Sequence, residues 1–393
     1  MAGEKKPPKT AAPPEDEVIL RLDGLVGNPR VRGLIERALT DKSLFPSLLF
    51  AGPSGIGKLT TARAIAASLN CLSPEGVQAC GTCGPCRKIA SGIHPDVKVL
   101  ESEASARDAG RPLYFPTSTP EGGNASPSRT GNRLLIAQVR NLVRETCFRP
   151  FEGRRRVLIL RDLETDPGQG CANVLLKTLE EPPTDTVFIV VTAQPERLPV
   201  TVHSRCHVLP FVAAPLAAVV AFLERRGIET AEAHWRAAWT NGCPGAALRL
   251  DAEARLRSRD ALLVALAAAV EGGPAAASVV AEPFSRRGVE LLPSLDDLTL
   301  VVRDLMIWDD DPDRNLLTNR DKIAEMEHLA ARIPPRRAAR LLAHIAWCAS
   351  ATERNVSPSL MWQTLFLEAG GHLADAPLTD PWLPELPGRE HPR

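Results

Sequence analysis

Short apolar segments alternate with amphipathic stretches through the first half of the chain. They are SLLFA (47–51), VKVL (97–100), VLIL (157–160), TVFIVVT (186–192) and CHVLPF (206–211). Because successive positions are apolar, these segments predict strands that are buried on both faces, as in a parallel sheet whose crossover helices cover each side. The pattern therefore predicts a doubly wound α/β domain over residues 18–209.

One helix of this domain has clear end signals. Asp166 is expected to be its N-cap, with Pro167 at the first helical position and Gln169 as the capping-box partner. Pro182 and Pro183 are expected to end it, because the residue before a proline is disfavoured from the helical region.

The strand pattern stops after Pro210, and Ala- and Leu-rich segments with a helical period follow. Breaks at Gly227 and at Asn241-Gly242 delimit a small helical unit over 210–252. Longer amphipathic segments such as LDDLTLVVRDLMIW and RRAARLLAHIAWCA predict an all-α domain over 253–375.

Three segments lack any period. Residues 1–17 are polar and Pro-rich, residues 376–393 are Pro-rich, and residues 101–132 are rich in Ser, Gly, Pro and Thr around the single Tyr114. We expect a disordered N-terminal tail, a loose C-terminal tail and a long flexible insertion.

The charges balance at 47 basic and 47 acidic residues, so any contact with nucleic acid would depend on local patches. The N-terminal residues do not form a secretory signal, and no apolar run appears long enough to span a bilayer. A cytoplasmic protein without a membrane partner is expected.

Four of the nine cysteines, Cys71, Cys80, Cys83 and Cys86, form the pattern C-x8-C-x2-C-x2-C. Two-residue gaps allow two sulfurs to face one ion, and four thiolates suit the tetrahedral preference of Zn²⁺. The spacing favours a structural zinc site over four reduced thiols. Redox chemistry is disfavoured, because C-x-x-C is not expected to open a helix of thioredoxin type.

A phosphate-binding loop follows the first apolar segment. Its sequence, GPSGIGK, places Gly52, Gly55 and Gly57 before Lys58 and before a helical stretch. Leu59 stands where the motif requires a Ser or Thr to ligate Mg²⁺, and the hydroxyl of Thr60 is expected to point elsewhere. The loop is therefore expected to hold a nucleotide without its metal ligand.

The acidic motif is incomplete as well. Asp162 ends the segment VLILRD, where a carboxylate that coordinates a metal would lie. Leu163 follows, where an ATPase of this type needs a glutamate to prepare the attacking water, and Glu164 is one position further.

Residues 171–209, CANVLLKTLEEPPTDTVFIVVTAQPERLPVTVHSRCHVL, resemble the subunits of the bacterial DNA polymerase III clamp loader. LLKTLEEPP and Ser204-Arg205-Cys206 carry the resemblance, which extends over roughly residues 22–250. It implies an AAA+ P-loop domain with a zinc module at 71–96, a small helical lid, and a collar formed by the all-α domain.

The family has an ATP-hydrolysing tau/gamma branch and a delta-prime branch that usually does not hydrolyse ATP. Leu59 and Leu163 favour the delta-prime branch. So does Gly245, which occupies the place of a nucleotide-sensing arginine, whereas Arg249 is expected to lie in a different helical phase. A tau/gamma-type subunit and a zinc-bearing adaptor outside replication remain the alternatives.

The resemblance to delta-prime subunits also implies a role and partners. Arg205 would act in trans, as an arginine finger at a neighbouring ATP site, although an arginine that only caps the last strand is the alternative. The partners would be the delta and tau/gamma subunits, primed DNA and, indirectly, the sliding clamp. Zn²⁺ would be structural and ATP would be bound, if at all, without hydrolysis, so the chain would contribute to the polymerase III holoenzyme, a nucleotidyltransferase, without being a catalyst alone.

Overall fold

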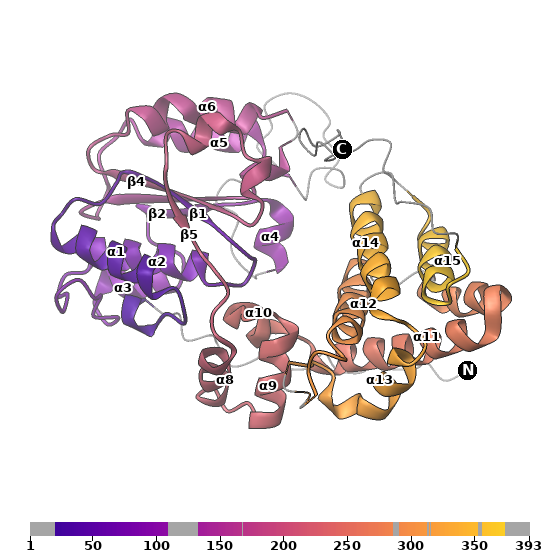
Figure 1. Cartoon of the computed structure of the whole chain (residues 1–393). Helices are drawn as coiled ribbons and strands as arrows, with labels where there is room; N and C mark the ends of the chain where they lie inside the picture. Colours follow the sequence, from indigo (N-terminus) through magenta and orange to yellow (C-terminus); the bar gives the residue numbers. More distant parts are fainter. Residues whose placement is uncertain are drawn as a thin grey trace, which may run out of the picture. The chain divides into compact units, whose positions relative to one another are not determined.

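The computed structural model describes residues 20–108, 133–166, 168–285, 291–312, 314, 316–352 and 356–373 (Figure 1). The chain divides into two compact units, one up to Arg249 and one from Leu250. Each unit has its own hydrophobic core, and each is described by itself.

The first unit contains a five-stranded parallel sheet in the order β2-β3-β4-β1-β5. Its strands are β1 (Ser47–Ala51), β2 (Val97–Leu100), β3 (Arg156–Arg161), β4 (Thr186–Thr192) and β5 (His207–Pro210). Leu49 of β1 pairs with Val190 of β4 and with Val208 of β5, so the strand that leads into the glycine loop is central. The predicted parallel α/β domain is confirmed.

Helices cover both faces of this sheet (Figure 1). The helices α1 (Pro29–Thr40), α2 (Lys58–Asn70) and α3 (Gly84–Ala90) lie on one face, and α5 (Ile136–Glu145) and α6 (Gly170–Glu180) lie on the other. Leu48 and Phe50 belong to the core on the α2 side, and Leu49 belongs to the core on the α6 side. The uninterrupted apolar run of β1 is explained by this burial on two faces.

Two local predictions were wrong. Helix α6 begins at Gly170, after a 3₁₀ turn at Leu163–Thr165, and Asp166 is not its N-cap. The Asp166 carboxylate still accepts a hydrogen bond of 2.7 Å from the backbone N–H of Cys171, inside the first turn. The second error concerns the insertion 101–132, which contains a helix, α4 (Glu103–Asp108).

Several predicted segments lie outside the described residues. These are the N-terminal and C-terminal tails, Pro167, and residues 109–132 of the insertion, which include Tyr114.

Three short helices complete the first unit: α8 (Leu216–Glu224), α9 (Thr230–Trp239) and α10 (Pro244–Arg249). The expected breaks are present, because Gly227 and Gly242 have φ angles of +84° and +74°, which favour glycine. A small core holds these helices together, formed around the fully buried Val219, Leu223 and Ala237.

The second unit is helical in every element that the structure describes. Its α-helices are α11 (Ala252–Ala281), α12 (Leu291–Met306), α13 (Ile323–Ala330), α14 (Pro335–Ala351) and α15 (Pro358–Ala369). Trp362 and Phe366 are fully buried in its core. The buried guanidinium of Arg259 is neutralised by Asp321, at N–O distances of 2.7 and 2.8 Å. The predicted helical C-terminal region is confirmed.

One helix contradicts the expectation that no segment resembles a membrane span. The stretch Ala252–Ser285 is long and apolar enough by length and composition, with a mean hydropathy of 1.7 in its most apolar window. Gly273 breaks its helical geometry just before Pro274. Leu262, Leu266 and Ala269 of this helix are buried in the core of the second unit, and 28% of its most apolar window is buried inside the structure.

Candidate functional site

The glycine loop connects β1 to α2, as predicted. Gly52, Gly55 and Gly57 have φ angles of +148°, +76° and +104°, a region that side chains strongly disfavour. The loop leads directly into the N-terminus of α2, where unpaired backbone N–H groups and the helix dipole favour an anion. The local geometry is therefore that of a phosphate cradle.

Lys58 is turned back onto its own loop. Its Nζ donates to the carbonyl oxygens of Gly52 and Pro53, the latter at 2.6 Å, and the residue is only 6% exposed. Burial, together with the nearby charge of Arg161, lowers the pKa of Lys58 to about 8. The ammonium thus has loop carbonyls, and no carboxylate, as its hydrogen-bonded partners in the described structure.

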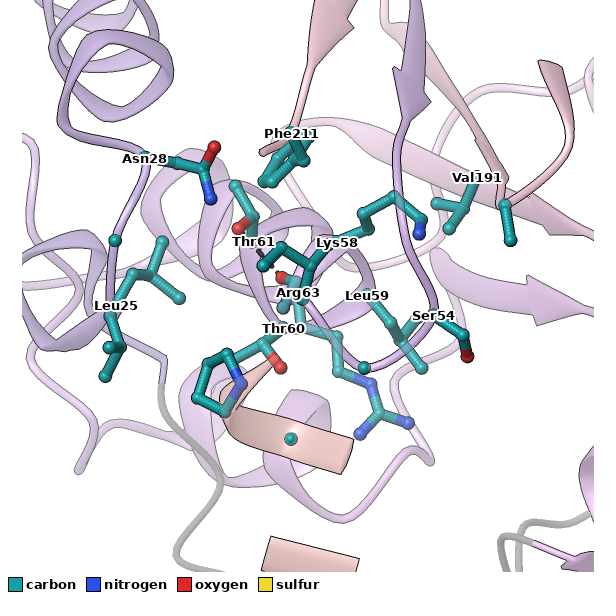
Figure 2. A pocket seen from close by; sticks show the side chains of 18 of the residues that line it. Leu25, Asn28, Ser54, Lys58, Leu59, Thr60, Thr61, Arg63, Val191 and Phe211 are labelled. Atoms are coloured by element: carbon teal, nitrogen blue, oxygen red, sulfur yellow. Dashed lines mark hydrogen bonds between the residues drawn. The ribbon is translucent and has the colours of Figure 1, made fainter. Parts of the chain in front are cut away.

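A cavity of about 630 Å³ opens beside the loop (Figure 2). Of the residues predicted to bind a nucleotide, Gly55, Gly57, Lys58 and Asp162 line it. Gly52 does not line it, and a Cβ there would lie 2.2 Å from the carbonyl oxygen of Phe211. Gly52 is required for the close approach of the two backbones.

Four further residues of α2 line this cavity, namely Leu59, Thr60, Thr61 and Arg63. Leu59 contributes an apolar surface where a hydroxyl would hold Mg²⁺, and Thr60 also lines the cavity. The Thr61 hydroxyl donates to the carbonyl of Gly57 at 2.9 Å and is therefore occupied by the helix itself.

The acidic side of the cavity lies at the carboxyl end of β3. Asp162 accepts hydrogen bonds from the backbone N–H of Ser102 at 3.1 Å and from its hydroxyl at 2.8 Å. Leu163 is 2% exposed and packs in the core on the α6 side, so it cannot act on water in the cavity. Burial raises the pKa of Glu164, whose Oε2 is enclosed and has no hydrogen-bond partner among the described residues.

Helix α10 is seated directly on the glycine loop. The backbone N–H of Gly245 donates to the carbonyl of Gly55 at 2.8 Å, and a Cβ at position 245 would lie 2.9 Å from that oxygen. A Cβ at Gly55 would lie 2.6 Å from the Cβ of Ala246. An arginine at position 245 does not fit this contact, which gives a steric reason for the glycine.

Arg249 requires a correction. It follows Gly245 by four residues, and positions i and i+4 of a helix lie on the same face, so the expected difference in phase was wrong. The structure places Arg249 in the lining of the same cavity as Gly245.

The contact between Gly55 and α10 predicts a difference between two glycine substitutions. Gly55→Ala and Gly57→Ala both place a side chain at positive φ, but only the first overlaps α10, since nothing lies within 4 Å of a Cβ at Gly57. We expect Gly55→Ala to destabilise the first unit by about 1–3 kcal/mol more than Gly57→Ala. Urea unfolding followed by the fluorescence of Trp235 and Trp239 in α9 measures the difference, and equal losses would contradict the contact.

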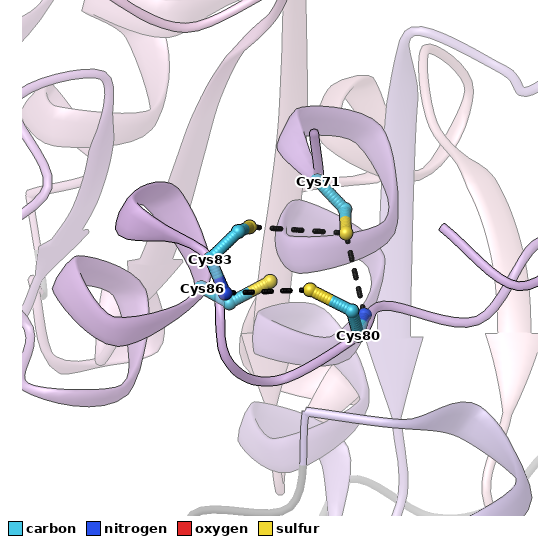
Figure 3. A group of neighbouring side chains, drawn as sticks. All are labelled: Cys71, Cys80, Cys83 and Cys86. Atoms are coloured by element: carbon cyan, nitrogen blue, oxygen red, sulfur yellow. Dashed lines mark hydrogen bonds between the residues drawn. The ribbon is translucent and has the colours of Figure 1, made fainter. Parts of the chain in front are cut away.

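Four cysteine sulfurs converge at the end of α2 (Figure 3). Cys71 follows the last residue of α2, Cys83 is the N-cap of α3 and Cys86 lies within α3. The four Sγ atoms lie within 4.8 Å of one another. Because Cys83 and Cys86 do open a helix, the helix argument against redox chemistry was wrong, and the convergence of all four sulfurs is the better reason to favour a metal.

The environments of the sulfur atoms differ, and the distance between two of them suits a tetrahedral ion. Backbone N–H groups of Thr82 and Cys83 lower the pKa of Cys80 to about 6. Burial raises the pKa of Cys71 and of Cys86. A tetrahedral ion with Zn–S bonds of about 2.3 Å separates its sulfurs by about 3.8 Å, and Cys71 and Cys83 are 3.9 Å apart.

Arg205 is not part of the cavity. It lies between α7 (Val200–His203) and β5, and its Nε and Nη2 donate to Glu180 at 3.2 and 3.1 Å. Its Nη1 donates to the carbonyl of Thr201 at 3.2 Å, and its side chain remains 29% exposed. The guanidinium is held in one orientation by its own chain while part of it faces outward.

Two of the lining residues that were not predicted from the sequence end neighbouring strands. Thr192 ends β4 with its hydroxyl accepting from the N–H of Gln194 at 3.0 Å, and Arg161 ends β3 in an ion pair with Glu101. The signal was available, because carboxyl ends of neighbouring parallel strands share one edge of the sheet, and polar residues end both strands.

Comparison with known proteins shows that part of this chain is similar to subunits of DNA polymerase III. Residues 27–215 match the model of a family described as DNA polymerase III, delta subunit. The DNA polymerase III subunit delta' of Pseudomonas aeruginosa is 37% identical over 158 residues, 40% of this chain and 40% of that protein. The delta' subunit of Escherichia coli is 32% identical over 230 residues, 58% of this chain and 60% of its own.

The tau subunit of Bacillus subtilis is 27% identical over 191 residues, 49% of this chain and 29% of tau. The chain thus spans about two fifths to three fifths of the length of the delta' relatives. A gamma subunit-related protein of Thermotoga maritima aligns with a TM-score of 0.36 and 16% identity over 86% of this chain and 98% of its own. The sequence matches confirm the resemblance to clamp-loader subunits that residues 171–209 indicated.

Proposed function

Residues 27–215 match the DNA polymerase III delta subunit family, and on that basis we propose that this chain is a delta-prime-type subunit of a clamp loader. In this role it would help the assembly to place a sliding clamp on primed DNA in the cytoplasm. Its neighbours would be delta and tau/gamma subunits. The structural observation that favours a delta-prime-type subunit over a tau/gamma-type subunit is a well-formed glycine loop beside Leu59, Leu163 and Gly245.

Three positions of the nucleotide site argue against hydrolysis by the chain itself. Leu59 offers no oxygen to Mg²⁺, Leu163 is buried in the core, and Gly245 is in backbone contact with Gly55. Each of them removes a different component, namely the metal ligand, the group that prepares water, and the sensing arginine. An active ATPase needs all three functions together.

Arg205 is proposed to serve a neighbouring ATP site as an arginine finger. Its partial exposure and its absence from the cavity of its own chain support this role. In the described structure Arg205 Nε and Nη2 donate to Glu180, so contact with a phosphate at a neighbouring site would require the guanidinium to leave this ion pair.

The cysteine cluster is proposed to hold a structural Zn²⁺. Cys71, Cys80, Cys83 and Cys86 supply four sulfurs and no open position for water. The ion would tie the end of α2, the helix that begins at Lys58, to the start of α3. We further propose that residues 210–252 act as a lid and residues 253–375 as a collar in a hetero-oligomer.

Assembly tests this function directly. We expect the full chain, mixed with purified delta and tau/gamma subunits, to co-elute with them in gel filtration at a defined ratio. A chain that stays apart from both subunits would contradict the proposal and favour an adaptor outside replication.

A tau/gamma-type ATPase is the second candidate, because tau relatives match about half of this chain. It requires the purified chain alone to hydrolyse ATP with stimulation by DNA. We expect no hydrolysis above background.

A further inference from the structure

The Arg205 guanidinium donates hydrogen bonds within its own chain. Its Nε and Nη2 both donate to Oε2 of Glu180, at 3.2 and 3.1 Å, and its Nη1 donates to the carbonyl oxygen of Thr201 at 3.2 Å. Arginine binds a phosphate most strongly through two parallel N–H groups of one edge. The edge formed by Nε and Nη2 is occupied by Glu180, so it cannot serve a phosphate at the same time.

The backbones on both sides of this ion pair are fixed. Glu180 is the last residue of α6 and directly follows the buried Leu179, whose carbonyl oxygen accepts a hydrogen bond of 3.2 Å from Ser47 of β1. Arg205 directly precedes Cys206, which is buried in the same core as Leu179. Because each partner is anchored by a buried neighbour, separation of the pair requires only rotation of the two side chains and no movement of the sheet.

The ion pair is weak enough to open. The side chains are 29% exposed for Arg205 and 59% exposed for Glu180, and ion pairs that are accessible to water contribute little to stability. A nucleotide phosphate carries more negative charge than one carboxylate, and a site between two subunits excludes water that would screen the attraction. The phosphates of a neighbouring nucleotide can therefore displace Glu180.

We propose that Glu180 is a positioning residue that holds Arg205 in a withdrawn orientation, with Nε and Nη2 on the carboxylate, until a neighbouring nucleotide competes for the guanidinium. The proposal rests on the role of Arg205 proposed above and adds a second residue with the opposite effect on hydrolysis. Only the fraction of Arg205 that is free of Glu180 can contact the phosphate, so the ion pair lowers the rate at the neighbouring site.

Hydrolysis of ATP by a loader reconstituted from this chain with delta and tau/gamma subunits tests the proposal. We expect Glu180→Gln to raise the single-turnover rate at the adjoining site about two- to fivefold at low ionic strength, the range that exposed ion pairs allow. The increase should shrink at high ionic strength, where salt already screens the pair. It should vanish when Arg205→Ala is also present, because Glu180 acts only through that arginine.

Glu181→Gln is the matched control. Glu181 is the next residue and is exposed, but the guanidinium of Arg205 donates to Glu180. The control removes the same charge and should leave the rate unchanged. A rate that is unchanged or lowered by Glu180→Gln would overturn the proposal. So would an equal increase from Glu181→Gln, or an increase that persists beside Arg205→Ala.

A measurement on the isolated full chain separates this proposal from the arginine-finger role. Phenylglyoxal adds to accessible guanidinium groups, and peptide mass spectrometry gives the rate of its addition at each arginine. We expect Glu180→Gln to speed modification of Arg205 about two- to fivefold. The exposed Arg144 of α5 serves as the internal reference, with an unchanged rate.

The two proposals fail in different ways. Unchanged modification of Arg205 in the Glu180→Gln chain would overturn the withdrawn orientation and leave the arginine finger intact. Faster modification, together with a loader whose hydrolysis is unaffected by Arg205→Ala, would overturn the arginine finger and with it the effect of Glu180 on hydrolysis.

Discussion

Replacing Cys83 by serine is expected to abolish stoichiometric zinc binding and to unfold the region between α2 and α3. Cys83 is the N-cap of α3, and its sulfur lies 3.9 Å from that of Cys71 at the end of α2. It therefore links the two helices that the cluster joins. Structural zinc contributes on the order of 10 kcal/mol to small zinc modules. The substitution should lower only the free energy of local unfolding between α2 and α3. The parallel sheet should stay folded, because it has its own core.

Metal analysis and hydrogen exchange measure this effect together. The unaltered chain should carry one zinc, and the variant much less than one, with faster exchange over 71–90. Cys147→Ser is the matched control, since Cys147 is exposed and lies outside the cluster. Less than one zinc per chain in carefully prepared unaltered protein would refute the metal site.

Replacing Arg205 by alanine is expected to lower ATP hydrolysis at the adjoining site of an assembled loader by about 10³-fold or more, the usual effect of losing an arginine finger. The overall rate would fall less, because other sites continue to work. Arg205→Lys should not restore the rate, since an ammonium cannot reproduce the two parallel bonds of a guanidinium. Single-turnover hydrolysis by the reconstituted complex measures the effect.

Assembly provides the control for this substitution. The Arg205→Ala chain should still co-elute with delta and tau/gamma, because only bonds to Glu180, Ser204 and Thr201 are lost. An arginine that only supports β5 would show the opposite pattern, with normal hydrolysis and a less stable chain.

The sheet could be predicted from the sequence because burial on two faces leaves an unambiguous pattern. The stretches LLFA around Leu49, VLIL around Ile159 and VFIVV around Ile189 are apolar at every position, and the structure pairs them in one sheet. The cysteine cluster was predictable from its spacing, which is typical of a zinc site, and the fold brings the four sulfurs within 4.8 Å of one another.

Features that depend on contacts between distant segments were not predictable. The start of α6 is delayed by the turn at Leu163–Thr165, and nothing in the local capping pattern at Asp166 shows this. The contact of Gly245 with Gly55 joins residues far apart in sequence. From the sequence, Gly245 could be interpreted only as the replacement of an arginine, and its close contact with the loop backbone could not be predicted. Arg249 was predicted to lie on a different helix face from Gly245. The four-residue spacing places the two on the same face, and this could have been recognised from the sequence.

The central claim is that this chain does not hydrolyse ATP at its own glycine loop and that Arg205 acts at the ATP site of a neighbouring subunit. ATP hydrolysis by reconstituted loaders that contain either Arg205→Ala or Lys58→Ala tests it most directly. The account predicts a large loss with the Arg205 variant and an unchanged rate with the Lys58 variant. Equal losses from the two substitutions would contradict it.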